Sequence, residues 1–389
     1  MIMQAFKILI LCFCFALSLK ASMNDEIEHI LKQSVNSKAF KNYAPKKDLK
    51  NLGKKFKAQK GFNIRIYGDS HMAADFFPRV IRDYVLRSNA VGFAYALQPK
   101  YQQNLNLNYE FKDFSILNSK IPSEKYYSYP LGGVVAKADK KGASINLNTK
   151  LETKEFKVGI LFKAPLSQNA FSIKDAKDRD FILRSNAKNK WSYKEFTPTF
   201  PLKIIALQKD AELGGYFIMD KNGKNEFLDT LAINGARSDL WKSWNLDVVK
   251  KELALLKNNL IILAYGSNDA LLKDFDRVEF KKNYKEWFKI LRKENKNAVF
   301  MLISPPTVTQ KKGKNYILSP NFHEVKKAIY ELAKEEKTLL FDMHEFMQES
   351  GGKALWIEKK LSLRDVHLSV AGYELMAKKI LEDFRKLFD

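Results

Sequence analysis

Three short segments of this chain carry residue types that could together catalyse acyl transfer. Gly68-Asp69-Ser70-His71 follows one apolar run and Gly266-Ser267-Asn268-Asp269 follows another, while Asp365-Val366-His367 stands just before the last predicted helix. A serine nucleophile requires a base, and that base requires a carboxylate that orients it. The segments together supply all three residue types.

We therefore expect Ser70 to be the nucleophile, His367 the base and Asp365 the orienting carboxylate. Positions i and i+2 point the same way only in extended chain, so this Asp-x-His pair should lie in the loop before a helix that Ser369 could cap. A developing oxyanion needs preset donors. The backbone N–H groups of Ser70 and Gly235 and the side-chain amide of Asn268 could supply them.

The elements that must position these residues are five short apolar runs, which read as buried strands. They lie at residues 62–67, 229–235, 258–266, 297–304 and 337–343, and helical segments alternate with the later ones. Strand–helix alternation predicts a parallel sheet with helices on both faces. Ligands bind such sheets beyond the carboxyl ends of the strands, where the three segments would meet.

Residues 98–228 interrupt this pattern with short stretches of alternating polarity and little helical period. We read them as an inserted β-rich domain, with a hairpin predicted at the Asn-Gly pair in residues 221–224. The predicted hydrolase domain is then discontinuous, over residues 61–97 and 229–389. Residues 22–60 read as an N-terminal helix and a lysine-rich connector.

The first 21 residues have the layout of a secretory signal peptide, with Lys7 before a 12-residue apolar run that is short for a bilayer span. The two cysteines lie inside this run, so the exported chain would have no disulfide. The net charge of +23 suggests an anionic partner. Export argues against nucleic acid and favours the cell envelope, with peripheral association with its anionic components; the sequence leaves the oligomeric state open.

The order of these motifs resembles that of the SGNH hydrolase superfamily, whose name records the Ser, Gly, Asn and His found here as Ser70, Gly235, Asn268 and His367. The longer string GDSHMAADFF at residues 68–77, the leader and the β-rich insertion are more specifically similar to the periplasmic peptidoglycan O-acetylesterases of Gram-negative bacteria.

The resemblance implies a three-layer flavodoxin-like fold, whose five-stranded parallel sheet would carry a sandwich-like insertion similar to a carbohydrate-binding module. It also implies a periplasmic serine esterase that needs no cofactor or metal. The substrate implied is the acetyl ester on the C6 hydroxyl of N-acetylmuramic acid in peptidoglycan. Two alternatives stay open: an O-acetyltransferase with the same triad, and a non-catalytic cell-wall-binding protein on the same scaffold.

Some residues permit a second interpretation. Asp342-Met343-His344 repeats the Asp-x-His pattern, but we read it as the exit of the fifth strand. For His71 we expect a packing or loop role, and for Asp69 a loop-fixing acceptor. Five aromatics could form a sugar-stacking platform in the insertion, although we favour core packing for most of them: Tyr126, Tyr127, Tyr129, Trp191 and Tyr193.

Overall fold

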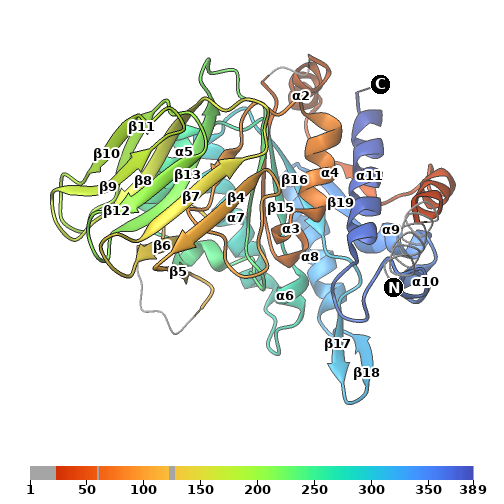
Figure 1. The fold of residues 1–389 in the computed structure, drawn as a ribbon. Coiled ribbons are helices and arrows are strands. Elements are labelled where there is room, and N and C mark those ends of the chain that lie inside the picture. The colour runs from red at the N-terminus through yellow and green to blue at the C-terminus, as the bar shows by residue number, and fades with distance from the viewer. Residues whose placement is uncertain (1–22, 59–60, 122–127, 389) are drawn as a thin grey trace, which may run out of the picture.

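The computed structural model describes residues 23–58, 61–121 and 128–388 of the chain. The predicted signal peptide, residues 1–21, lies outside the described residues, as do Tyr126 and Tyr127. The chain forms an α/β part beside a β-rich part, which Figure 1 shows at the right and the left.

The α/β part is built on a six-stranded sheet in the order β1-β19-β16-β15-β2-β14. Its strands are β1 (Phe40–Asn42), β2 (Asn63–Gly68), β14 (Phe227–Ala232), β15 (Leu260–Ala264), β16 (Val299–Ser304) and β19 (Leu339–Asp342). The five predicted strands are all present and run parallel, in the order 2-1-3-4-5 of flavodoxin-like sheets. The sixth strand, β1, pairs antiparallel with β19, so the predicted five-stranded sheet was one strand short.

Both faces of this sheet are covered by helices because its strands are apolar on both sides. Along β2, Ile64 and Ile66 face one core while Tyr67 faces the other. The helices that pack into the first core include α4 (Phe76–Val85), α9 (Met343–Glu349), α10 (Gly352–Glu358) and α11 (Val370–Lys386). Those of the second core are α5 (Leu246–Leu255), α7 (Arg277–Glu294) and α8 (Phe322–Glu335).

The segment predicted as a lysine-rich connector is more ordered than expected. Residues 23–33 are helical as predicted, but β1 and helix α2 (Lys46–Ala58) follow them. Helix α2 buries Leu49 and Leu52, and Phe56 packs its ring edge against Phe384 of α11. The lysines thus occupy the solvent face of a helix that is packed on the fold.

The β-rich part lies between α4 and β14 and consists of two sheets that share one apolar core. One sheet has the order β10-β9-β12-β7-β4, with strands β4 (Leu107–Lys112), β7 (Ser144–Thr149), β9 (Asn169–Lys174), β10 (Asp180–Arg184) and β12 (Leu202–Ala206). The other has the order β11-β8-β13-β6-β5, with strands β5 (Phe114–Asn118), β6 (Val134–Ala138), β8 (Phe156–Lys163), β11 (Ser192–Phe196) and β13 (Glu212–Asp220), and β3 (Gly92–Ala94) pairs with β13. Two antiparallel sheets packed face to face make a sandwich.

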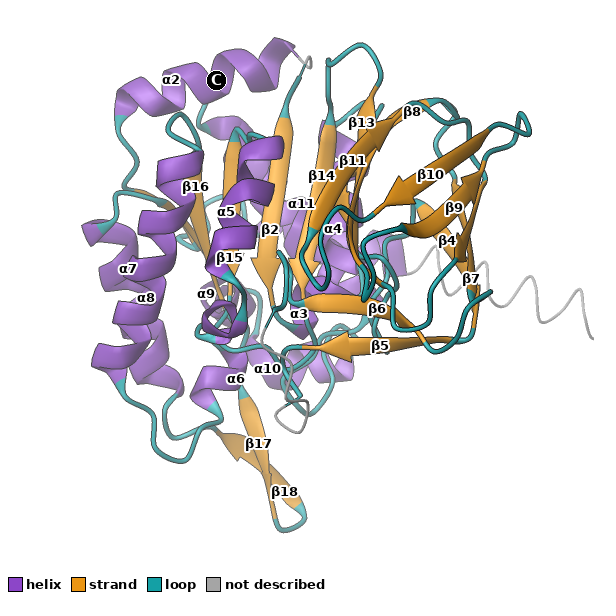
Figure 2. Cartoon of the chain, turned by 90° about the vertical axis from the view of Figure 1, so that its left-hand side faces the viewer, coloured by secondary structure: helices purple, strands orange, loops and turns teal. Residues whose placement is uncertain are grey.

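The predicted hairpin at residues 221–224 is wrong. A turn is present and Gly223 adopts a positive φ of 77°, but the turn leads from β13 of the sandwich into β14 of the parallel sheet. β14 pairs with β2, and the described partners of β13 are β3, β6 and β8. The Asn-Gly pair therefore marks the passage from one part of the chain to the other, at the β14 edge that Figure 2 shows beside the sandwich.

A buried ion pair joins the two parts at this edge. Arg65 of β2 donates two hydrogen bonds to Asp229 of β14, at 2.8 and 2.6 Å, and both side chains are fully buried. Asp229 also accepts the backbone N–H of Phe93 in β3 at 2.8 Å. Asp229 therefore bonds to β2 of the parallel sheet and to β3 of the sandwich. Because both buried charges are paired, this contact fixes the edge strand β14 against the sandwich.

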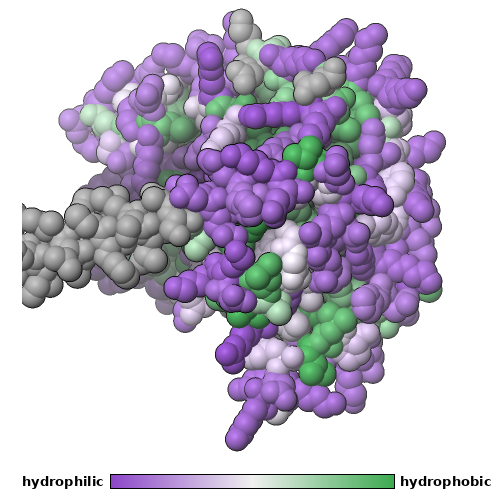
Figure 3. All heavy atoms as spheres, turned by 90° about the vertical axis from the view of Figure 1, so that its right-hand side faces the viewer, coloured by the Kyte–Doolittle hydropathy of each residue, from purple (hydrophilic) through white to green (hydrophobic). Residues whose placement is uncertain are grey.

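Within the described residues, no helix is both long and apolar enough to cross a membrane. The face of the molecule that carries α11 is largely hydrophilic, with small apolar patches between charged side chains (Figure 3).

Candidate active site

The candidate site lies at the carboxyl edge of the parallel sheet, where short helices follow the strands. β2 ends at Gly68, and Ser70 begins α3 (Ser70–Ala73). α6 (Ser267–Ala270) follows β15, and a 3₁₀ turn, η1 (Leu240–Ser243), follows β14. A side chain at Gly68 would come within about 3.0 Å of the Ala264 carbonyl, so glycine allows β2 and β15 to approach just before the serine.

Ser70, His367 and Asp365 form a continuous hydrogen-bonded chain. Ser70 Oγ lies 3.0 Å from His367 Nε2, and His367 Nδ1 lies 3.1 Å from Asp365 Oδ2. The second carboxylate oxygen accepts the backbone N–H of His367 at 2.9 Å. Burial acts to raise the pKa of Asp365, but the hydrogen bonds from His367 outweigh it and the pKa is lowered. Ser369 caps α11 by accepting the N–H of Gly372, so the pair lies in the loop before a capped helix, as predicted.

The predicted oxyanion donors face the same cavity as Ser70. Gly235 and Asn268 line it, and Gly235 has a positive φ of 75° that favours glycine. The amide nitrogen of Asn268 donates to the Ala236 carbonyl at 2.9 Å and makes a long 3.5 Å contact with Asp69. A contact of that length is weak, so this second N–H remains open to a better-placed acceptor.

Two buried carboxylates fix the loops that carry these donors. Asp269 accepts the hydroxyl of Ser238 at 2.7 Å and its backbone N–H at 3.2 Å, which ties the loop after β14 to α6. Burial raises the pKa of Asp269 to about 6 and that of Asp69 to about 7. Asp69 caps α3 by accepting the N–H of His71 at 3.0 Å, the loop-fixing role expected from the sequence.

His71 links all three segments from beneath the site. It is buried, with Nδ1 3.0 Å from the Tyr373 hydroxyl and Nε2 2.8 Å from Ser267 Oγ. The Tyr373 hydroxyl also makes a long 3.5 Å contact with the N–H of Leu368. Burial, helped by the charges of His367 and Lys353, lowers the pKa of His71 to about 3 and keeps the ring neutral.

Two of the residues that support the base loop carry no sequence pattern that indicates this role. Tyr373 was visible only as one position of an apolar helical stripe, and Lys353 had no pattern around it. Lys353 of α10 donates to the backbone carbonyls of Asp365 and Thr307. Burial lowers the pKa of Lys353 to about 8.

The second Asp-x-His pair lies outside the candidate site, in agreement with its interpretation as the exit of the fifth strand. Asp342 ends β19 and caps α9, and it accepts the Tyr330 hydroxyl at 2.7 Å. His344 Nδ1 lies 2.8 Å from Thr307 Oγ1, and burial lowers the pKa of His344 to about 4. This pair is therefore part of the packing around β19.

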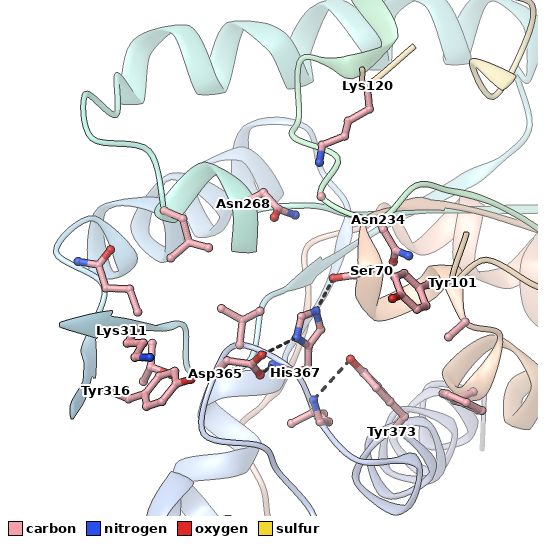
Figure 4. Close-up of a pocket in the computed structure, with 18 residues that line it drawn as sticks. Ser70, Tyr101, Lys120, Asn234, Asn268, Lys311, Tyr316, Asp365, His367 and Tyr373 are labelled. Atoms are coloured by element: carbon pink, nitrogen blue, oxygen red, sulfur yellow. Dashed lines mark hydrogen bonds and ion pairs between the residues drawn. The ribbon is translucent and has the colours of Figure 1, made fainter. Parts of the chain in front are cut away.

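The cavity over Ser70 has a volume of about 770 Å³, well above what an acetyl group needs. Figure 4 shows Ser70 and His367 at its centre, with Asn268, Asn234 and Lys120 above and beside them. Tyr101 and Lys120 come from the segment between α4 and β14, so this segment forms part of the cavity wall. Lys311 and Tyr316 come from a hairpin of β17 (Thr309–Lys312) and β18 (Asn315–Leu318), which the sequence did not predict.

The aromatics considered for a sugar platform in the insertion are largely core residues where they are described. Tyr129 is buried in the second core, and Trp191 and Tyr193 pack against that core. Trp191 also donates to the Ser128 carbonyl at 2.8 Å.

Two family models match the chain. Residues 90–203 match the N-terminal part of peptidoglycan O-acetylesterases, and residues 216–375 match the GDSL-like lipase/acylhydrolase family. Ser70 lies outside both matched ranges because the insertion separates it from the rest of the hydrolase part, and the fold returns it to His367. A comparison with curated protein sequences gives no match.

Among solved structures, one of a peptidoglycan O-acetylesterase has 20% identity and a TM-score of 0.75, covering 90% of this chain and 99% of that one. A family two carbohydrate esterase from Clostridium thermocellum has 11% identity and a TM-score of 0.30, covering 72% of this chain and 98% of that one. The first likeness shows a shared fold over nearly the whole chain. The predicted resemblance is confirmed, and the chain is a carboxylic ester hydrolase with a GDSL-like part and a β-rich part.

Proposed function

We propose that this GDSL-like ester hydrolase is a serine esterase that removes O-acetyl groups from peptidoglycan. The observation that carries the proposal is the continuous chain of Ser70, His367 and Asp365, open to a cavity large enough for part of a glycan. The match of residues 90–203 to the N-terminal part of peptidoglycan O-acetylesterases supports the substrate class. Within that class, the ester we propose is the acetyl group on the C6 hydroxyl of N-acetylmuramic acid.

In the proposed reaction, Ser70 Oγ bonds to the acetyl carbonyl carbon while its proton passes to His367 Nε2. The bond from that carbon to the sugar oxygen then breaks, and His367 returns the proton to the departing oxygen. Asp365 holds His367 in the tautomer that presents a free Nε2 to the serine. The N–H groups of Ser70 and Gly235 and the amide of Asn268 would stabilise the oxyanion.

Water completes the proposed cycle. A water molecule gives a proton to His367 and attacks the acetyl-serine carbonyl, and the bond to Ser70 Oγ breaks as His367 returns that proton. Acetate leaves and the serine is restored. No step calls on a metal or a cofactor.

Peptidoglycan lies outside the cytoplasm, so the proposed substrate agrees with the exported, periplasmic location proposed from the leader. The charge of +23 suits a polymer with peptide carboxylates and would favour contact with other anionic envelope components. The β-rich part could add affinity for the polymer in the manner of a carbohydrate-binding module.

The experiment is acetate release from O-acetylated peptidoglycan by the purified exported chain, with and without an added saccharide acceptor. Release that the acceptor leaves unchanged supports an esterase. Acetyl groups that appear on the acceptor instead would identify a transferase. Binding to the polymer without release or transfer would identify a wall-binding protein.

A further inference from the structure

Two exposed tyrosines border the cavity on opposite sides of the reacting serine. Tyr101 is 72% exposed and Tyr316 is 41% exposed, although both are large and partly apolar. Figure 4 shows Tyr101 on one side of the Ser70–His367 pair and Tyr316 on the other, beyond Asp365. Exposed aromatic side chains gathered at one cavity are typical of a binding surface.

Tyr101 is held in an unusual backbone conformation. Its φ of 65° lies in the left-handed region, which a tyrosine enters at an energetic cost. The Lys100 ammonium lies 4.8 Å from the centroid of the ring and favours one ring orientation. A strained backbone at an exposed ring indicates that the surrounding chain holds that ring in place.

Hydrogen bonds on both sides of Tyr101 supply this constraint. The Asn234 amide donates to the Lys100 carbonyl at 3.2 Å, from the loop that also carries Gly235. Gln103 donates from its backbone to Ala73 at 3.0 Å and from its side chain to Ala74 at 2.8 Å, at the end of α3. The loop is thus anchored to the two segments that bear Ser70 and Gly235, so the backbone that carries the ring has a fixed place relative to the serine.

Tyr316 is placed from the other side by the β17–β18 hairpin, which projects from the body of the molecule in Figure 2. Thr309 at the base of this hairpin donates to the Arg364 carbonyl at 2.7 Å, directly before Asp365. The second ring is therefore coupled to the base loop, as the first is coupled to the nucleophile segment.

The wall of the cavity is largely apolar, and it includes several polar side chains besides the reacting ones: Lys120, Asn234, Gln310 and Lys311. Amide and ammonium groups suit hydroxyls and carboxylates, and the apolar parts of the wall suit the acetyl group and the C–H faces of sugar rings. The C–H face of a pyranose ring is apolar and packs on an aromatic ring, while its hydroxyls point outward to such polar groups. The combination fits a saccharide that extends beyond the reacting residue in both directions.

We propose that Tyr101 and Tyr316 are stacking platforms for sugar rings on either side of the acetylated residue, so that the enzyme acts on residues inside a glycan strand. This inference rests on the proposed function and assigns part of the substrate contact to the β-rich segment. An isolated acetylated disaccharide could engage only one platform at a time, whereas a longer strand engages both. We therefore expect a higher kcat/KM for strands than for the disaccharide.

The test compares kcat/KM for acetate release from O-acetylated glycan strands, freed of stem peptides and separated by length, with that for the acetylated disaccharide. The wild type is expected to prefer strands. Tyr101→Ala and Tyr316→Ala should each lower kcat/KM for strands about tenfold. The strand-to-disaccharide ratio should fall to near unity in the variant that removes the platform which the disaccharide does not reach, and in the double variant. Tyr101→Phe keeps the ring and should keep the ratio. Tyr84→Ala, at a 54% exposed tyrosine of α4, is the matched control.

A ratio in Tyr101→Ala and Tyr316→Ala equal to that of the wild type would overturn the inference, as would a wild type that favours the disaccharide. Failure of the proposed function looks different. In that case the wild type would hydrolyse a small ester such as 4-nitrophenyl acetate but release no acetate from any acetylated glycan.

Discussion

Replacing Asp365 by asparagine tests the geometry of the base most sharply, because its two oxygens accept from different donors. One accepts the backbone N–H of His367 at 2.9 Å and the other faces His367 Nδ1 at 3.1 Å. An asparagine that keeps its oxygen on the backbone N–H must point its amide N–H at Nδ1. The proton then moves to Nε2, and His367 cannot accept the serine proton.

The asparagine can recover the productive tautomer only by flipping, which leaves the backbone N–H of His367 without its acceptor. That loss costs about 1 kcal/mol, so about one molecule in six would be productive. The variant also lacks the negative charge that stabilises the imidazolium. A buried triad loses about 10⁴ in kcat on this change. The Asp365 side chain is 43% exposed and water screens its charge, so we expect a loss of about 10²–10³.

The assay is kcat for hydrolysis of 4-nitrophenyl acetate by variants whose folding is checked by circular dichroism. Asp342→Asn is the matched control, since the carboxylate of the other Asp-x-His pair caps α9 and accepts the Tyr330 hydroxyl. That control should have a lower Tm and a kcat close to the wild-type value. A folded Asp365→Asn with kcat within a factor of a few of the wild type would refute the tautomer argument.

Three further predictions concern the surrounding residues. Asn268→Ala should lower kcat by about 10²–10³ and change KM far less, because the amide acts on charge that develops in the transition state; a higher KM at unchanged kcat would show ground-state binding instead. The lowered pKa of His71, about 3, means that the unfolded chain takes up a proton below about pH 6.5 while the folded protein does not. As the pH falls from about 6.5 to 3, the free energy of unfolding contributed by this group should therefore decrease by up to about 1.4 kcal/mol per pH unit. Denaturant titrations of His71→Gln should lack this decrease. Equal pH dependence of the unfolding free energy in both proteins would argue against the buried neutral histidine. His344→Ala should lower Tm and leave kcat near normal in the folded fraction. Loss of turnover in a folded variant would show that His344 is the base.

The parallel sheet and the reacting residues could be predicted because each signal is local. Buried strands appear as apolar runs, and the residue after each run must lie at the carboxyl edge. Ser70 and Asn268 are identified by that rule, and His367 by its Asp-x-His spacing before the last helix, without knowledge of any distant contact. Their distances from one another, and the acceptor that the Asn268 amide adopts, required the structure.

Features that depend on distant partners could not be predicted in this way. Strand β1 has three residues, and it pairs with β19, some three hundred positions away. The spacing of Leu49, Leu52 and Phe56 is typical of one apolar face of a helix, as in α2. The many lysines around these residues instead favour a solvated connector, which is the interpretation drawn from the sequence. The role of the insertion in the cavity wall depends on the anchoring of Tyr101, which no local pattern indicates.

The central claim is that Ser70 forms an acetyl-enzyme, and the most direct measurement is acetate release from O-acetylated peptidoglycan by the wild type and by Ser70→Ala, with folding of both verified. Mass spectrometry after exposure to a serine-directed covalent inhibitor adds the position of the modified residue. The account predicts acetate release by the wild type, none by Ser70→Ala, and a single modification on Ser70. Acetate release by a folded Ser70→Ala, or modification of another residue with loss of activity, would contradict it.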